Sequence, residues 1–141
     1  MIALCGLIGI WTEDSSSSGP IDQEETSLDD DTLNQFVNTV RRFVDERLIP
    51  LEAQVASEDR MPPELIDEMR EMGLFGLTIP QSYGGVGLNT LQECMVVMEL
   101  GRAAPAFRSI IGTNNGIGSQ GIVMDGTEAQ KSYYLPRMAS G

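Results

Sequence analysis

The stretch DTLNQFVNTVRRFVDERLIP (31–50) decides the fold class. Its apolar residues recur at intervals of three and four, the spacing that gathers side chains on one side of an α-helix. Ser27 followed by Asp30 resembles an N-cap ahead of this helix. Pro50 is expected to kink or end it, after which LEAQVA (51–56) could continue for another turn or two. The apolar set is Leu33, Phe36, Val37, Val40, Phe43, Val44 and Leu48.

A second helical pattern covers residues 62–72. Pro62-Pro63 suits its first turn, and Gly73 is expected to end it. After a short apolar connector comes the glycine-rich stretch SYGGVGLN (82–89). A dinucleotide-binding loop needs a preceding strand in a βαβ unit, and a P-loop ends in G-K-[ST]. Neither condition is met, so the sequence predicts a plain turn here.

A third helix is predicted for LQECMVVMELGRA (91–103). Thr90 and Glu93 ahead of and within it form the T-x-x-E pattern of a capping box. The segment is apolar on nearly every side, which is typical of a central, buried helix. We therefore expect Cys94 to be a small core side chain.

A fourth helical pattern runs from Phe107 to Ile122 and is interrupted by glycines. Thr127 with Gln130 caps a last helix, which Pro136 is expected to limit. No segment of useful length alternates apolar and polar residues, which is the pattern of a half-buried strand. The sequence thus predicts an all-α fold, an irregular bundle of four to five helices with a disordered acidic N-terminal arm.

Two parts of the chain differ in composition. Residues 1–27 are expected to be an apolar leader and a disordered acidic tether, and residues 28–141 a single folded domain. The leader MIALCGLIGIW (1–11) is shorter than the ~20 residues of a membrane-spanning helix, so we expect no membrane span. Eight acids and no base lie in residues 1–31; the rest, with 13 acids and 9 bases, carries 9 − 13 = −4 of the total charge of −12.

The composition excludes several classes of function. A chain with net charge −12 repels phosphate backbones, so nucleic-acid binding is disfavoured. It contains no His, which removes His-based nucleophile systems and His-ligated metal sites. Two cysteines make no disulfide framework, which favours a reducing compartment and a cytoplasmic location.

The segment Thr113-Asn114-Asn115 is unusual because it lies inside a glycine-rich apolar helix pattern. Such clustering indicates close backbone approach or the wall of a cavity. The alternative, favoured on sequence grounds, is tight helix packing with one Asn exposed. Arg108 lies four residues before Gly112 and could share that surface; its alternative role is an ordinary surface ion pair.

Four segments together carry a family resemblance: LIPLEAQ (48–54), EMGLFGLTIPQSYGGVGLN (71–89), MELGRAAPAFRS (98–109) and GTEAQKSYYLPRMASG (126–141). Residues from about 32 to 141 resemble the N-terminal α-helical domain of the FAD-dependent acyl-CoA dehydrogenases. The four pieces occur in the family's order and at near-family spacing.

The resemblance implies an oxidoreductase that acts on the CH–CH group of acyl-CoA thioesters, with FAD as cofactor in the full-length enzyme. It also implies an electron-transfer partner and a homo-oligomer when full length. In this family the N-terminal domain forms one wall of the acyl and flavin site. The chain ends at Gly141, before the family's flavin-contacting T-E-P-x-A-G-S-D motif and catalytic carboxylate. We therefore expect a fragment that binds no FAD and is not catalytic alone.

The helix with Arg108, Gly112 and Thr113 resembles the family segment at the distal end of the acyl chain, which implies substrate-binding roles for these residues. In the glutaryl-CoA branch, an Arg at the position matching Arg108 faces the substrate's terminal carboxylate. Gly112 stands where that branch has a Ser, so the acyl chain length and the dicarboxylyl preference stay open. The resemblance assigns no catalytic, cofactor-binding or metal-binding residue to this chain.

A second hypothesis treats the chain as a stand-alone helical protein-interaction module derived from that domain. Its acidic arm would recruit a basic partner. The module predicts a stable folded monomer or dimer with salt-sensitive partner binding. The fragment hypothesis instead predicts exposed apolar surface where the absent domains would dock.

Overall fold

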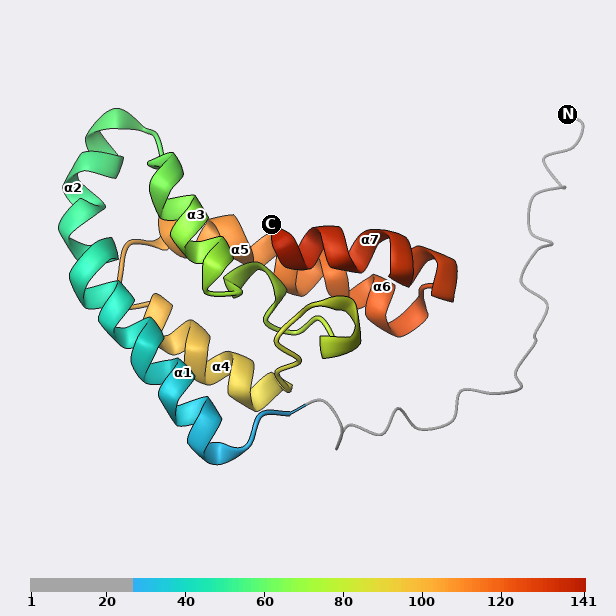
Figure 1. The fold of residues 1–141 in the computed structure, drawn as a ribbon. Coiled ribbons are helices and arrows are strands. Elements are labelled where there is room, and N and C mark those ends of the chain that lie inside the picture. Colours follow the sequence, from blue (N-terminus) through green and yellow to red (C-terminus); the bar gives the residue numbers. More distant parts are fainter. Residues whose placement is uncertain (1–26) are drawn as a thin grey trace, which may run out of the picture.

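The computed structural model describes residues 27–141, which form five helical rods (Figure 1). No strand occurs in this part of the chain, so the all-α prediction and the predicted number of helices are confirmed. The expectations for the apolar leader and the tether concern residues outside the described range. The rods comprise α1 (Asp30–Phe43), η2 (Val44–Leu48) and α2 (Ile49–Glu58); α3 (Pro63–Glu71); α4 (Thr90–Leu100); α5 (Pro105–Thr113), η5 (Asn114–Gly118) and α6 (Ser119–Asp125); and α7 (Glu128–Ser140). Two short 3₁₀ turns, η3 (Leu74–Gly76) and η4 (Gln81–Tyr83), lie between α3 and α4.

The first rod begins at Asp29 rather than at Ser27. The Asp29 carboxylate accepts hydrogen bonds from the Thr32 backbone N–H (2.9 Å) and hydroxyl (2.6 Å). An Asp at this position satisfies a helix N–H that has no partner within the helix, and Ser27 lies two residues too early to do so.

Pro50 does not end the first rod, which continues to Glu58 as the sequence allowed. A wide π-turn precedes the proline, and the Ile49 N–H donates to Val44 O, five residues back. Because proline lacks an N–H and its ring crowds the preceding turn, the widened turn accommodates it within a continuous helix. The rod ends where Asp59 adopts a left-handed conformation (φ 48°).

The glycine-rich stretch 84–87 forms a turn, as predicted. Its backbone N–H groups are occupied by the preceding connector: Val86 N donates to Gly76 O (2.8 Å) and Gly87 N to Ile79 O (3.0 Å). The two bonds hold the turn against the connector segment that precedes it. Gly73, also predicted as a helix end, follows α3 with φ 72°.

Helix α4 differs from its prediction in two respects. Asn89 rather than Thr90 is its N-cap, and its capping box uses Gln92 rather than Glu93. The helix is also not buried all round: it packs mainly against α1 and α5, and several of its side chains are exposed. Leu91 is 73% exposed and Met98 74%, and Cys94 is exposed rather than in the core.

Helix α7 begins at the predicted capping box of Thr127 and Gln130 but is not limited by Pro136. It runs on to Ser140 because Leu135 and Ala139 are buried against Ile79. Pro136 itself is exposed, so the carbonyl that loses its helix partner lies on the solvent side. The packing of the buried face therefore overrides the local preference of the proline.

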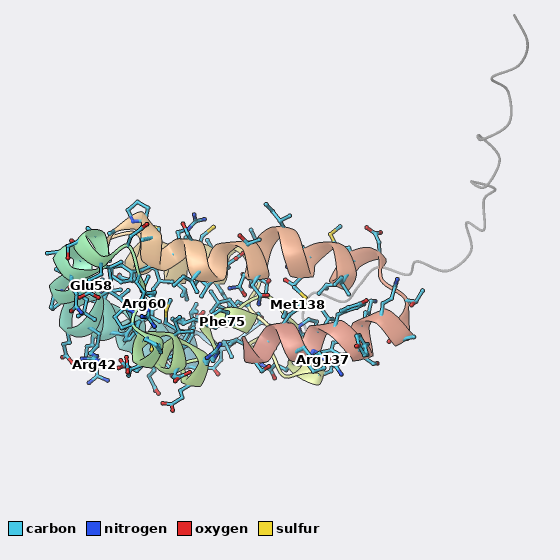
Figure 2. All side chains as sticks on the ribbon, turned by 90° about the horizontal axis from the view of Figure 1, so that it is seen from above. Arg42, Glu58, Arg60, Phe75, Arg137 and Met138 are labelled. Atoms are coloured by element: carbon cyan, nitrogen blue, oxygen red, sulfur yellow. The ribbon has the colours of Figure 1, made fainter. Side chains whose placement is uncertain are left out.

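The core has two parts of unequal size. The larger part joins α1 to α5, and the smaller part joins α6 and α7 to the connector around Ile79. Asn114 links the two: its side-chain amide donates to Phe75 O (2.6 Å) and Met138 O (2.7 Å). Phe75 and Met138 are labelled near the middle of Figure 2, between the α5–α6 rod and α7.

Candidate functional site

A small cavity of about 90 Å³ lies between α4, α5 and the connector after α3. Helix α4 supplies Glu93 and Val97, α5 supplies Arg108 and Gly112, and the connector supplies Leu77. The remaining lining residues are Ile111, Asn115 and Gly116. The wall is thus largely apolar, with a single carboxylate and a single guanidinium.

The three predicted site residues are only partly brought together. Arg108 and Gly112 line this cavity, one helical turn apart on α5. Thr113 is exposed and does not line it, because it follows Gly112 by about 100° around the helix. Arg108 forms no ion pair within 4.0 Å among the residues that the structure describes, so its alternative as a surface ion pair does not hold.

Glu93 is a lining residue that the sequence did not reveal. The sequence analysis placed it in a capping box, a role that Gln92 fills instead. Burial raises the pKa of the Glu93 carboxyl, and the positive charge of Arg108 partly opposes that rise. A charged residue in the first turn of a mostly apolar helix was the one signal available, and only the packing of α4 on α5 brings it to the same cavity as Arg108.

Two glycines give the cavity its space. A Cβ atom built on Gly112 or Gly116 would meet no atom within 4 Å outside the local helix backbone. Neither glycine is therefore required by packing within the described chain. Gly118 differs, since a Cβ there would lie 2.9 Å from the Thr113 carbonyl oxygen.

The asparagine pair holds this rod to the connector. The buried Asn115 accepts from the Leu77 N–H (2.7 Å) and donates to Leu74 O (2.7 Å) and Ile111 O (3.2 Å). The cavity-wall interpretation is supported, because Gly112, Asn115 and Gly116 line the cavity. Close backbone approach is not found at Gly112 or Gly116, where an added Cβ atom would meet no atom within 4 Å. The prediction that one Asn is exposed is wrong, because Asn114 is half-buried and binds the carbonyls of both core parts.

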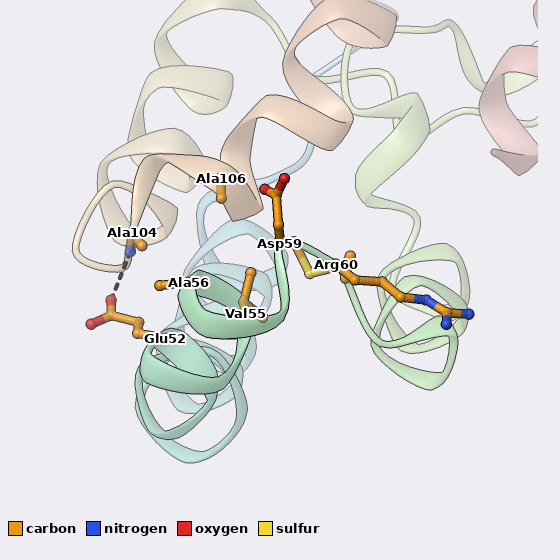
Figure 3. A pocket seen from close by; sticks show the side chains of 8 residues that line it. Glu52, Val55, Ala56, Asp59, Arg60, Ala104 and Ala106 are labelled. Atoms are coloured by element: carbon orange, nitrogen blue, oxygen red, sulfur yellow. Dashed lines mark hydrogen bonds between the residues drawn. The ribbon is translucent and has the colours of Figure 1, made fainter.

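A second, larger cavity of about 250 Å³ lies between the end of α2 and the start of α5 (Figure 3). Its principal polar contact is structural: the Glu52 carboxylate accepts a hydrogen bond from the Ala104 N–H (2.7 Å). The carboxylate satisfies an amide at the start of α5, where helix N–H groups lack partners. The Glu52 carboxylate therefore acts as a cap, and Asp59 and Arg60 are the other charged residues that line this cavity.

Within residues 27–141 no group of three or more carboxylates or thiols is arranged to hold a metal ion. No helix in that range is long and apolar enough to cross a membrane. Exposed apolar side chains are frequent on α4 and on the rod formed by α5, η5 and α6: Leu91 73%, Met98 74%, Ile117 89% and Met124 65% exposed.

Curated proteins are similar in sequence to this chain over most of its length. The chain is 38% identical to (2S)-methylsuccinyl-CoA dehydrogenase of Cereibacter sphaeroides, over 79% of this chain and 20% of that protein. It is 31% identical to mitochondrial isovaleryl-CoA dehydrogenase of Bos taurus, over 98% of this chain and 33% of that protein. The chain therefore spans a third or less of the length of these relatives.

A solved structure described as an electron transferring flavoprotein of Acidaminococcus fermentans superimposes with a TM-score of 0.71 at 30% identity. The match covers 82% of this chain and 30% of that chain. The family model "Acyl-CoA dehydrogenase, N-terminal domain" matches residues 30–141, the whole of the helical part. The chain therefore belongs to the acyl-CoA dehydrogenase family and carries its N-terminal domain.

Proposed function

We propose that this chain is the N-terminal domain of an FAD-dependent acyl-CoA dehydrogenase and forms one wall of its acyl site. The observation that carries the proposal is the cavity between α4 and α5. Arg108 and Gly112, the positions that match the family's acyl-contacting segment, line the same apolar space. Thr113 would reach the acyl chain only from the exposed side of α5.

A flavin accepts the hydride in such enzymes when bound. We infer that the described residues do not bind the flavin by themselves. In the glycine-rich turn, the backbone N–H groups of Val86 and Gly87 already donate hydrogen bonds to carbonyl groups of the connector. We therefore assign FAD binding and the catalytic carboxylate to the remaining length that the relatives possess. The chain alone is expected to show no acyl-CoA-dependent reduction of an electron acceptor, and a measurable rate above buffer would refute this assignment.

The exposed apolar residues of α4, η5 and α6 support the fragment hypothesis over the interaction module. The fragment hypothesis predicts that the absent domains cover Met98 and Ile117, which are 74% and 89% exposed. Dye binding and light scattering of the purified chain test this. Strong binding of a hydrophobic dye and aggregation favour the fragment. A stable monomer or dimer that binds a basic partner in a salt-sensitive manner favours the module.

The choice of acyl tail is the finer question. One relative's name specifies methylsuccinyl-CoA, whose tail ends in a carboxylate, and another specifies isovaleryl-CoA, whose tail ends in methyl groups. Arg108 is the residue suited to recognise a carboxylate. The test is Arg108→Ala in the longer protein that contains this chain, comparing glutaryl-CoA with a neutral acyl-CoA. An unchanged preference between the two substrates would show that Arg108 does not recognise the end of the acyl chain.

The same proposal includes an acyl-CoA substrate, an electron-transfer partner and a homo-oligomeric full-length enzyme. A cytoplasmic location belongs with it, because the exposed thiol of Cys94 suits a reducing compartment. One of the relatives named above, the bovine enzyme, is designated mitochondrial. Fractionation of source cells with an antibody against residues 27–141 would separate the two locations.

A further inference from the structure

Two opposite charges share the small cavity without a close partner. Glu93 comes from the first turn of α4 and Arg108 from the middle of α5. The ion pairs between described residues include neither of them. They are the only charged residues that line the cavity. The two charges therefore act on each other and on whatever enters the space between them.

Glu93 has no structural task that would explain its position. The N-terminus of α4 is capped by Asn89 and Gln92, and Gln92 also bonds to the backbone of Leu28. A glutamate in a first turn benefits from the helix dipole, but an exposed side chain would gain as much without burial. The half-buried carboxylate thus carries a desolvation cost that the fold does not need.

The residues around Glu93 strengthen the electrostatic effect of its charge. Leu77, Val97 and Ile111 supply apolar wall, and Gly116 leaves the space beside them open. Charges in a partly desolvated, apolar setting are screened less than charges in bulk water. A second carboxylate that approaches Arg108 in a cavity of about 90 Å³ would also lie close to Glu93.

We propose that Glu93 is a specificity-determining residue: its carboxylate is the protein's own counter-charge for Arg108, so the cavity disfavours ligand groups that carry a carboxylate and accepts neutral ones. The identification of that ligand as an acyl tail rests on the proposed function. The electrostatic relation between Glu93 and Arg108 does not. Replacing Glu93 by a neutral residue of the same shape leaves Arg108 available to a ligand carboxylate.

The test is a titration of the chain with acetate, which is the carboxylate group alone, followed by NMR at the side-chain Nε–Hε of Arg108. Glu93→Gln is expected to bind acetate at least about tenfold more tightly than the unchanged chain. The double variant Glu93→Gln/Arg108→Gln should lose this gain when followed through the backbone amide of Gly112. Glu64→Gln is the matched control, because it removes one negative charge from an exposed residue that does not line the cavity.

Equal acetate affinity in the unchanged chain and in Glu93→Gln would overturn the proposal, whether both bind or neither does. A gain of the same size in Glu64→Gln would also overturn it, since net charge alone would then explain the effect. Thermal unfolding checks that each variant folds, and Glu93→Ala replaces Glu93→Gln if the latter does not. Failure of the proposed function would appear elsewhere, as an unchanged substrate preference of Arg108→Ala in the longer protein.

Discussion

Glycine has opposite tasks in the turn around Gly85 and in the rod that contains Gly112 and Gly116. A Cβ on Gly85 would lie 2.0 Å from the Ile79 carbonyl oxygen, so no other residue fits. A Cβ on Gly112 or Gly116 would meet nothing within 4 Å. The first region uses glycine to bring two backbones together, and the second leaves space beside Arg108. Glycine-rich sequence therefore indicates a tight turn in the first region and the wall of a candidate site in the second.

The largest expected effect is Gly85→Ala, which should lower the free energy of unfolding by about 3 kcal/mol, because the rigid Ile79 backbone cannot move aside. Urea unfolding followed by circular dichroism measures it. Gly84→Ala is the control: its Cβ meets nothing, and only its φ of 84° is unfavourable, at about 1 kcal/mol. A smaller loss for Gly85→Ala than for Gly84→Ala would contradict the close-approach role.

Asn115→Ala is expected to cost about 2 kcal/mol, because it leaves the buried Leu77 N–H and Leu74 carbonyl without their partner. Asn115 lies in the same rod as Gly112 and Gly116. Like the turn glycines, however, it holds two segments together, here the rod and the connector after α3. Hydrogen exchange of the Leu77 amide should accelerate along with the loss of stability. The half-buried Asn114→Ala should cost less, and the reverse order would contradict the assignment.

Gly116→Ala is expected to raise the free energy of unfolding by up to about 1 kcal/mol, because alanine favours the helix and the added methyl group meets no atom. Gly118→Ala, two residues on in the same rod, is the matched control and should destabilise, since its Cβ would approach the Thr113 carbonyl to 2.9 Å. Urea unfolding of both variants compares them. Destabilisation by Gly116→Ala would show that its space is needed by the chain itself.

The smallest effect concerns the charge in the cavity. Burial raises the pKa of Glu93, so its ionisation disfavours the folded state. This penalty is absent below the unfolded pKa of about 4.3 and complete above the raised folded pKa. Glu93→Gln should therefore be slightly more stable than the unchanged chain at pH 7, and the difference should vanish near pH 3.

Glu68→Gln is expected to change the free energy of unfolding in the opposite direction from Glu93→Gln. The Arg47 guanidinium, 2.5 Å from Glu68, holds the pKa of that carboxyl below its usual range. Its stabilisation is present above the unfolded pKa and is lost as the pH falls through the folded pKa. Glu68→Gln should thus be less stable at pH 7 and equal to the unchanged chain at low pH. Parallel behaviour of the two variants would contradict the distinction between the buried and the paired carboxylate.

The helices themselves could be predicted because their signals are local. The apolar spacing of residues 31–48 and the capping pair of Thr127 and Gln130 are properties of neighbouring residues, and both are confirmed. The errors arise where two local signals compete or where packing decides. Asn89 and Thr90 are both good caps, and Pro136 stays inside α7 because the buried side of that helix holds it.

The candidate site could be predicted only in part. Arg108 and Gly112 were identified through their likeness to a family segment, and both line the cavity. Thr113 was included through the same likeness, but it is exposed and does not line the cavity. Glu93 escaped notice because it lies 15 positions before Arg108, on another rod, and only the packing of α4 against α5 brings the two charges to one space.

By itself, the sequence determined the helical periods, the turn glycines, the absence of His and the family resemblance, because each depends on residue types at short range. Tertiary structure alone decided which side of α4 is buried, which glycines leave room and which charges face each other. Those properties depend on distances between rods that are far apart in the chain. Burial, space and electrostatic pairing are relations between segments, and no single segment contains them.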